Sequence, residues 1–103
     1  MRPAEFRQVY DEGVRVPGRL FAAFCLRRAE ARGPRIGVTT PRSLGNAVAR
    51  NRIRRRLKEC VRTRLARFGS CWEVVFNPRR ALIEAPLAEL EREVEKICAK
   101  CAD

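Results

Sequence analysis

The spacing of apolar residues along the chain predicts three helices. Residues 5–12 carry apolar side chains at helical spacing and form a short first helix. Residues 46–67 show the longest helical pattern, and Asn46 is of a type that caps helix starts. A last amphipathic helix is predicted over residues 87–101, after Pro86. The apolar stripe of the long helix consists of Ile53, Leu57, Cys60, Val61, Leu65 and Phe68.

Three apolar runs predict strands. Residues 19–26 (RLFAAFCL) are almost continuously apolar, which favours a strand that is covered on both faces. Residues 36–40 (IGVTT) and 72–76 (WEVVF) are short β-branched or aromatic runs. Pro41 follows one of them and Asn77-Pro78 the other, so each strand is expected to end there.

These elements predict one α+β domain over residues 1–103, with a single sheet packed by helices. The order is αββαβα, or αβββαβα if residues 15–26 form a hairpin or a bent strand. No repeat or low-complexity linker suggests a domain boundary.

Charge is concentrated in the middle of the chain. The 103 residues include 23 Lys and Arg against 12 Asp and Glu, for a net charge of +11. Residues 35–67 hold 11 basic residues and one acid, whereas residues 1–34 and 68–103 have net charges of +3 and −2. Such a footprint points to nucleic acid as partner, or secondly to an anionic membrane surface. The hydrophobic content of 46% is too high for a disordered basic tail.

The residue types that are absent narrow the possible chemistry. The chain has no His, which excludes Ser–His and Cys–His nucleophile pairs. Carboxylates, a bound metal or a partner molecule must therefore supply any activity. We find no signal peptide and no apolar run of about 18 residues. A cytoplasmic protein with no membrane contact is expected.

The five cysteines do not suggest a disulfide framework or a zinc site. Their number is odd and they are scattered over predicted strands and helices. Cys98 and Cys101 form a C-x-x-C without a second pair, and both continue the apolar stripe of the last helix. Buried or half-buried thiols are expected.

The segment from Arg50 to Arg67 is the most basic part of the chain. Nine of its 18 residues are Lys or Arg. On a helical wheel Arg54 and Lys58 fall on one shoulder of the apolar stripe, where they can line a groove between helix and sheet. The helix is expected to bury one face and to offer Arg on nearly every other side, with Arg52, Arg56 and Arg67 on the far side.

The kind and spacing of these cations favour a polyanion over a solvated helix face. Arg outnumbers Lys 20 to 3, and a guanidinium grips phosphate oxygens in pairs and stacks on bases. Without acids at i,i+4 to pair with, the closely spaced charges would repel one another.

Aromatic residues crowd into the first quarter of the chain, at Phe6, Tyr10, Phe21 and Phe24. Most are expected in the core. An aromatic platform beside a basic groove is also how proteins hold single strands by stacking.

The run from Gly45 to Arg55 (GNAVARNRIRR) resembles the signature of the bacterial ribonuclease P protein component, a Gly-x-Ala-Val-x-Arg-Asn-Arg-x-Lys-Arg stretch that opens the family's long helix. Residues 5–10 resemble the Asp/Glu-Phe-x-x-Val-Phe of its first helix. Residues 35–37 resemble its Arg-x-Gly strand. The resemblance covers nearly the whole chain, in order and with compatible spacing.

The resemblance implies an α/β sandwich of order αβββαβα with a left-handed βαβ crossover, against the usual right-handed rule. It implies that the catalyst is an RNA that binds Mg²⁺ and hydrolyses the bond between the 5′ leader and the tRNA. The protein would bind this RNA, contact the leader of the precursor tRNA, and raise the affinity for metal and substrate. No obligate protein partner is implied.

The resemblance also assigns roles to residues. Positions that contact the catalytic RNA are Arg50, Asn51, Arg52, Arg55, Arg42 and Arg35, and Asn51 would help to bind a metal ion shared with the RNA. Positions in the leader-binding cleft are Phe6, Tyr10, Phe24, Arg54 and Lys58.

The chain departs from the family pattern at several of these places. Tyr10 replaces the usual Phe, and Phe24 replaces a common Tyr. Ser43 stands where the family has a cation before the motif glycine. Asn77-Pro78 replaces Arg-Pro after the last strand, with Arg79 and Arg80 beyond it.

The charge pattern is also compatible with four other kinds of protein. A structural RNA-binding protein, such as a ribosomal protein, explains the charge but not the joint placement of the aromatic helix, the strand and the basic helix. A DNA-binding helix-turn-helix would need a second short helix before the recognition helix, and the run at 19–26 argues against it. A membrane-surface helix would need Trp or Phe on its buried face. A protein-only nuclease needs clustered carboxylates, whereas the acids at 84–95 look like a solvated helix face.

Overall fold

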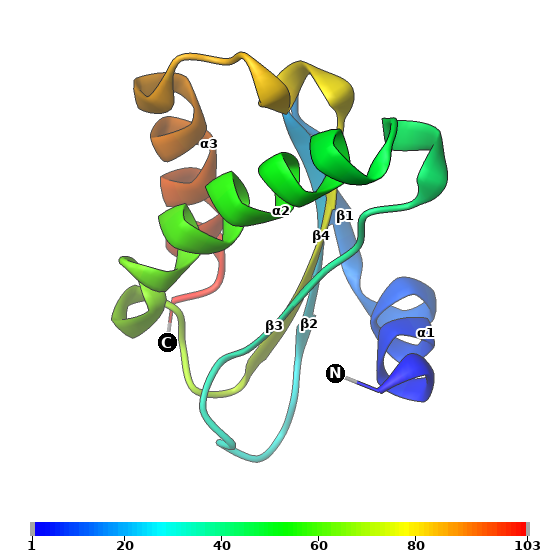
Figure 1. Ribbon diagram of the computed structural model, residues 1–103. Helices are drawn as coiled ribbons and strands as arrows, with labels where there is room; N and C mark the ends of the chain where they lie inside the picture. Colours follow the sequence, from blue (N-terminus) through cyan, green and yellow to red (C-terminus); the bar gives the residue numbers. More distant parts are fainter. Residues whose placement is uncertain (1, 103) are drawn as a thin grey trace.

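The computed structural model describes residues 2–102 and confirms the order αβββαβα (Figure 1). The helices are α1 (Pro3–Glu12), α2 (Ala47–Arg62) and α3 (Leu87–Lys100), and the strands are β1 (Val14–Val16), β2 (Phe21–Arg27), β3 (Arg35–Val38) and β4 (Trp72–Pro78). Three short 3-10 turns are η1 (Arg42–Leu44), η2 (Leu65–Arg67) and η3 (Arg80–Ile83). The hairpin alternative is therefore the correct one, because β1 pairs antiparallel with β2.

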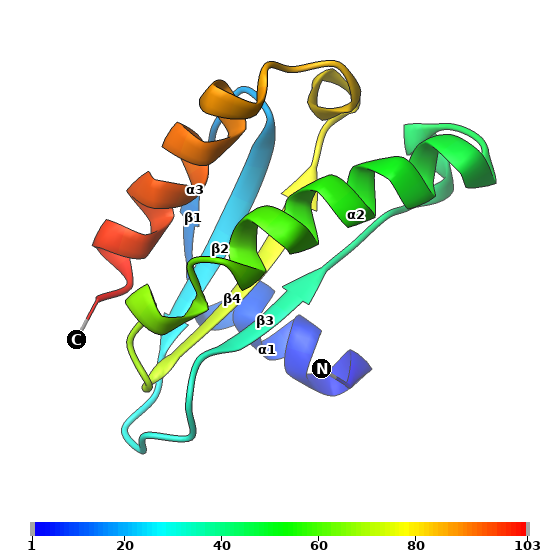
Figure 2. The ribbon, with the colours of Figure 1, turned by 60° about the vertical axis from the view of Figure 1, so that its left-hand side comes forward.

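The four strands form one sheet in the order β1-β2-β4-β3. β2 and β4 are antiparallel, whereas β3 and β4 are parallel and are joined through α2. In Figure 2 β3 and β4 both point upward, and α2 lies in front of the sheet. The chain leaves β3, crosses through α2 and enters β4, which lies to the left of β3. The crossover is thus left-handed, as the resemblance implies and against the general preference.

Helices cover both faces of the sheet. α2 and α3 lie on one face and α1 on the other (Figures 1 and 2). Alternation along β2 serves the two layers, since Phe21, Ala23 and Cys25 join the cluster under α2 and α3. Val9 of α1 is fully buried on the opposite face.

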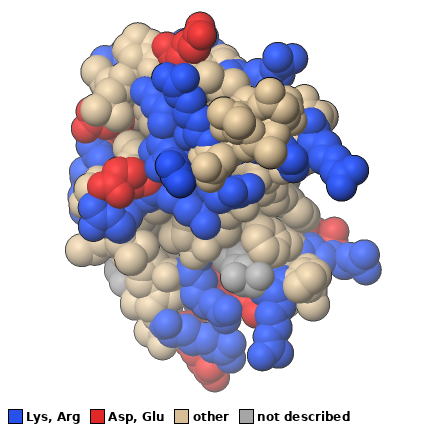
Figure 3. Space-filling view, viewed as in Figure 1, with Lys and Arg blue, Asp and Glu red and all other residues tan. Residues whose placement is uncertain are grey.

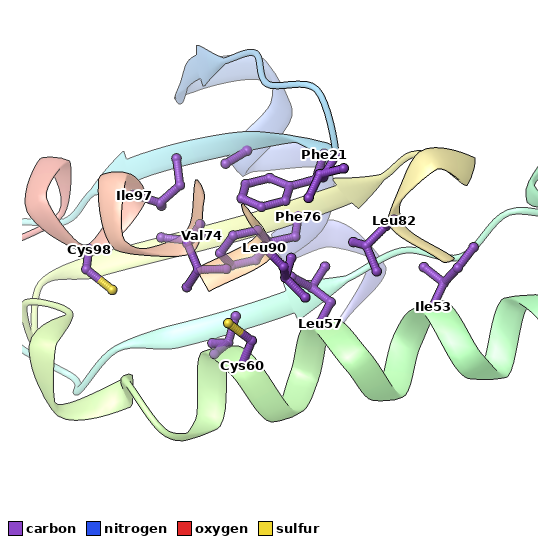
Figure 4. Packing of buried hydrophobic residues seen from close by; sticks show 14 of the residues in the cluster. Phe21, Ile53, Leu57, Cys60, Val74, Phe76, Leu82, Leu90, Ile97 and Cys98 are labelled. Carbon is purple, nitrogen blue, oxygen red and sulfur yellow. The ribbon is translucent and has the colours of Figure 1, made fainter. Parts of the chain in front are cut away.

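The main core is apolar and is shared by α2, α3 and the sheet. In Figure 4 Ile53, Leu57 and Cys60 project from α2 toward Val74 and Phe76 of β4. Phe76 also meets Phe21 edge-to-face, with 5.1 Å between the ring centroids. Burying a side chain of this size stabilises the fold by about 1.5–3 kcal/mol, so this layer holds α2 rigidly on the sheet.

A buried charge pair helps to fasten α1. Glu73 of β4 is only 3% exposed and accepts hydrogen bonds from Arg28, from Nε to Oε2 at 3.0 Å and from Nη2 to Oε1 at 3.2 Å. Arg28 Nη2 also donates to Gln8 Oε1 of α1 at 2.6 Å. One guanidinium therefore joins the sheet to the helix and neutralises the buried carboxylate.

The long helix is shorter than its apolar pattern predicts. α2 ends at Arg62 rather than near Arg67, and the Thr63 hydroxyl donates to the Cys60 carbonyl at 3.0 Å. The turn η2 then redirects the chain, so that Phe68 is buried while Leu65 is 40% exposed. Leu65 therefore does not belong to the buried stripe. The chain forms this turn instead of continuing the helix because the turn brings Phe68 into the core.

Strand ends also differ by a few residues from the sequence pattern. β4 continues through Pro78, which pairs with Phe21, because proline needs no amide hydrogen at a strand end. β2 begins at Phe21 rather than at residue 19. β3 ends at Val38, which leaves Thr39 and Thr40 just beyond the strand.

The cysteines are free thiols, and Cys98 and Cys101 are buried as expected. Burial raises the pKa of the Cys98 thiol above its usual value. Within residues 2–102, no three His, Cys, Asp or Glu side chains lie together in a way that would hold a metal ion. No helix in this part of the chain is long and apolar enough to cross a bilayer.

Candidate nucleic-acid interface

A glycine and an asparagine place the start of α2. Gly45 has a φ of +134°, a conformation that L side chains rarely adopt, and a Cβ there would lie 3.2 Å from the Cβ of Ala49. Asn46 caps the helix as predicted, because its Oδ1 accepts a 2.8 Å hydrogen bond from the Ala49 amide. Because the helix begins at Ala47, the motif residues Arg50, Asn51 and Arg52 lie about one turn into it.

The three motif residues differ in exposure. Asn51 and Arg52 are exposed, whereas Arg50 is half-buried. Arg50 Nε is buried and has no hydrogen-bond partner among the described residues. Arg42 in η1 is also exposed, directly before this turn of helix. The segment thus offers cations and an amide outward from a rigid helix.

Basic side chains gather over the face on which α2 lies, with few acids among them (Figure 3). Within residues 2–102, five of the nine cations between positions 50 and 67 have no acidic side chain within 4.0 Å and no hydrogen-bonded partner. These are Arg50, Arg52, Arg55, Lys58 and Arg67. Their charge is uncompensated and available to a polyanion.

Arg56 corrects the expectation that the far side of the helix offers its cations to solvent, because it is half-buried. Its Nη1 donates to the carbonyls of Leu82 and Ile83 at 2.6 and 3.1 Å, and its Nη2 donates to the Ala85 carbonyl at 2.8 Å. The guanidinium therefore holds η3 and the residues after it against α2. The helical wheel could not show this, because the acceptors lie about 30 residues away.

Arg64 also makes its contacts within the fold and is not available to a partner molecule. Its Nη2 bonds to the carboxylates of Glu91 and Glu95 of α3, and only 14% of its side chain is exposed. The hydrogen bond that Arg64 donates to Glu91 raises the pKa of Arg64 above its ordinary value. Acids that looked like a solvated helix face in the sequence thus tie α3 to the end of α2.

An aromatic pocket lies on the opposite face of the sheet, beside α1. It is lined by Pro3, Phe6, Arg7, Tyr10, Asp11 and Thr39. Phe24 of β2 meets Tyr10 edge-to-face at a centroid distance of 4.8 Å. Phe6, Tyr10 and Phe24 are all half-buried, so of the four crowded aromatics only Phe21 enters the core. Three predicted cleft residues are therefore brought together.

Polar contacts at the end of β3 link this pocket to α2. Thr39 donates a 2.8 Å bond to Asn77 Oδ1, which also accepts one of 2.8 Å from the Tyr10 hydroxyl. The next residue, Thr40, accepts a 2.7 Å bond from Arg54 Nη2. Successive residues of an extended chain face opposite sides, so the two threonines reach the two faces. Arg54 thus contacts the residue next to the pocket-lining Thr39, on the side of the sheet that faces α2, and it does not line the pocket itself.

Lys58 and Arg35 lie outside this arrangement. Lys58 is exposed in a groove on α2 that is also lined by Arg54 and Arg55, and it does not line the aromatic pocket. Arg35 forms a 2.6 Å ion pair with Glu5 of α1 and lines a separate pocket under that helix. The predicted residues therefore fall into a basic face, an aromatic pocket and the ion-paired Arg35.

Sequence reasoning did not single out Thr39, Thr40 or a side-chain role for Asn77. A usable signal existed for the threonines, since two polar residues at the end of an apolar strand commonly carry contacts. Nothing in the sequence indicated that Asn77 would meet Tyr10, which is 67 positions away.

Comparisons of the sequence with known proteins all point to one family. A family model described as Ribonuclease P matches residues 1–102. A "Ribonuclease P protein component" of Symbiobacterium thermophilum is 35% identical over 92 residues, covering 89% of this chain and 80% of the relative. One of Chloroflexus aggregans is 39% identical over 101 residues, covering 93% and 71%.

Solved structures share the fold. The RNase P protein of Staphylococcus aureus superposes with a TM-score of 0.83 at 23% identity, covering 100% of this chain and 95% of the other. That of Thermotoga maritima gives a TM-score of 0.84 at 18% identity, covering 100% and 97%.

Proposed function

This chain belongs to the ribonuclease P protein family and is the protein subunit of a ribonuclease P, and on that premise we propose a role for each face of the molecule. The basic face of α2 binds the RNA subunit, with Arg50, Asn51 and Arg52 in contact and Arg42 and Arg55 beside them. The aromatic pocket holds the single-stranded 5′ leader of precursor tRNA. Arg35 is a further RNA contact.

The uncompensated charge of α2 is the observation that carries the proposal. Arg50, Arg52 and Arg55 have no acidic partner in the described part of the chain, and α2 is fixed by the core beneath it. Because the helix backbone is fixed, these guanidinium groups can pair with phosphate oxygens without any rearrangement of the fold. An RNA helix or loop that lies along α2 would release counterions from these contacts.

The aromatic pocket supplies a different kind of contact. Phe6 and Tyr10 present ring surface to the pocket, and a ring of this kind stacks on any base. Arg54 bonds to Thr40, the neighbour of the pocket-lining Thr39, and from there its charge can neutralise the phosphate of a leader that continues past the pocket. Lys58 extends the same cationic line along α2. The protein therefore grips a single strand without reading its full sequence.

We further propose that the RNA subunit performs the cleavage with Mg²⁺, in the bacterial cytoplasm. The absence of His supports this assignment, because the commonest general base is missing. Within residues 2–102 no cluster of ligands fits a metal ion held by protein alone. The exposed Asn51 amide oxygen fits only a shared ligand, with the RNA supplying the rest.

Reconstitution tests the proposal. We expect the purified protein alone to leave precursor tRNA intact, and the cognate RNA alone to cleave slowly at low Mg²⁺. Adding the protein to the RNA should raise the rate. Cleavage by nucleic-acid-free protein would contradict the assignment of catalysis, and an unchanged rate would favour a structural RNA-binding protein without a part in cleavage.

A further inference from the structure

We propose that Asn77 is a positioning residue of the aromatic pocket: its side-chain oxygen fixes the ring of Tyr10 and thereby sets the strength with which the pocket grips a single-stranded RNA segment. The inference rests on the proposed function of this pocket. It assigns a role to a residue that does not itself line the pocket and that carries no charge.

One oxygen atom joins two distant parts of the chain. Asn77 Oδ1 accepts hydrogen bonds of 2.8 Å from the Tyr10 hydroxyl and 2.8 Å from the Thr39 hydroxyl. Tyr10 belongs to α1 and Thr39 follows β3, whereas Asn77 lies in β4. Two hydroxyl donors on one amide oxygen use both of its lone pairs. The amide therefore fixes helix and strand end relative to each other.

The backbone at Asn77 is well placed to hold these groups. Its neighbours Phe76 and Pro78 are buried, and the residue pairs with Ala22 of β2. β4 is an inner strand, hydrogen-bonded on both sides. The backbone of such a strand cannot shift without disturbing the sheet, so Asn77 projects from a fixed point toward the more exposed α1.

The Tyr10 ring is thereby constrained at two places. Phe24 meets it edge-to-face, with an interplanar angle of 90°, and Asn77 holds its hydroxyl. A ring that is already ordered loses little conformational freedom when a base stacks on it. Removal of the hydroxyl contact would leave the stacking surface present but less well ordered.

The two residues are matched to each other in this chain. At both positions the chain differs from the pattern that it resembles, in which Phe is usual at position 10 and Arg is common at position 77. A Phe has no hydroxyl to donate, and an Arg has no acceptor. The contact requires a hydroxyl at position 10 and an acceptor at position 77, and this chain has both.

The experiment is a double-mutant cycle in the reconstituted ribonucleoprotein. Asn77→Ala, Tyr10→Phe and the double variant are compared by their Kd for a precursor tRNA with a leader and for mature tRNA. We expect Asn77→Ala to weaken precursor binding about threefold to tenfold, the usual scale of one net hydrogen bond, and to leave mature tRNA unchanged. In the Tyr10→Phe background the same change should have a much smaller effect.

A spectroscopic measurement follows the ring itself. Tyr10 is the only tyrosine, so its ring ¹³C signals report on one residue in the full-length protein. Asn77→Ala should shift and average these signals, and Asn77→Asp, which retains the acceptor, should keep them close to those of the parent protein. Glu89→Gln is the matched control, because it removes a hydrogen bond between Arg19, just before β2, and α3, away from the pocket.

The outcomes separate the inference from the function on which it rests. Equal weakening of precursor and mature tRNA by Asn77→Ala, or additive effects in the cycle, would overturn the positioning role. If Phe6→Ala weakens precursor binding but Asn77→Ala does not, the pocket binds the leader and the inference about Asn77 is wrong. If Phe6→Ala also has no effect, the proposed function of the pocket fails and the inference falls with it.

Discussion

The guanidinium of Arg54 donates a 2.7 Å hydrogen bond to the hydroxyl of Thr40 and so ties the basic helix to the end of β3. α2 and the aromatic pocket lie on opposite faces of the sheet, and this contact at the edge strand lies one residue from the pocket-lining Thr39. Arg54 differs in this respect from its neighbour Arg55, which is exposed on α2 without such a contact.

Truncation of Arg54 should therefore affect the leader more than the body of the tRNA. We expect Arg54→Ala to weaken binding of leader-bearing precursor about tenfold, the scale of one charge-assisted hydrogen bond, with little change for mature tRNA. The comparison is made by Kd in the reconstituted ribonucleoprotein. Arg92→Ala, an exposed cation of α3, is the control. Equal loss for both RNAs would refute the groove assignment.

Lys58→Ala should act in the same direction but more weakly. Lys58 lies in the groove on α2 and does not line the aromatic pocket. A single lysine acts as a point charge on a flexible stem, so its loss costs less than that of a fixed guanidinium. The same two binding measurements decide this. An effect larger than that of Arg54→Ala would place the leader along α2 instead of in the pocket.

Salt dependence tests the contact between α2 and the RNA subunit. Arg52 is exposed and has no acidic partner among the described residues. If it neutralises one phosphate, Arg52→Ala should reduce the slope of log Kd against log salt by about 0.7–0.9. The affinity is measured from about 50 to 300 mM monovalent salt. An unchanged slope, like that expected for Lys96→Ala on α3, would remove Arg52 from the interface.

Arg56 should matter for stability and not for RNA binding. Its guanidinium donates to three carbonyls between Leu82 and Ala85, and these would lose their partner in Arg56→Ala. We expect a loss of about 2 kcal/mol in the free energy of unfolding, measured with urea. Arg55→Ala on the exposed side should lose less than about 0.5 kcal/mol. Similar stability of the two variants would contradict this division of the cations.

The ion pair of Arg19 with Glu89 predicts a stability change in acid. Hydrogen bonding from Arg19 holds the pKa of Glu89 below its usual value. The pair therefore stabilises the fold above the unfolded-state pKa of Glu89, and the contribution disappears as the pH falls through the lower folded-state pKa. The difference in unfolding free energy between the parent protein and Glu89→Gln should be constant near neutral pH and shrink below about pH 4. A difference that grows in acid would reverse the assigned shift.

Alkylation tests the interpretation of the C-x-x-C as buried thiols. Cys71 is half-exposed, whereas Cys98 and Cys101 are at most 2% exposed. Burial also raises the pKa of Cys98, which lowers its thiolate fraction. Mass spectrometry after iodoacetamide treatment should show Cys71 modified first, and the other two only after unfolding. Rapid modification of Cys98 in the folded protein would contradict this.

Local patterns were sufficient for much of this molecule. The 3.6-residue period of α2 and α3 and the apolar run of β2 determine which faces are buried, because burial along one element repeats with its geometry. The Asn46 cap depends only on its own neighbours and was predictable for the same reason. The run from Gly45 to Arg55 was sufficient to indicate the family.

Contacts between distant elements were decided only by the tertiary structure. α2 stops at Arg62, and the turn after it brings Phe68 into the core. Arg56 and Arg64 form hydrogen bonds with groups about 30 residues away. Tyr10 meets Asn77 because α1 packs on the face of β4 from which Asn77 projects. A sequence pattern reports whether a side chain is buried, but the partner of a polar group depends on which elements meet, and that is a property of the assembled fold.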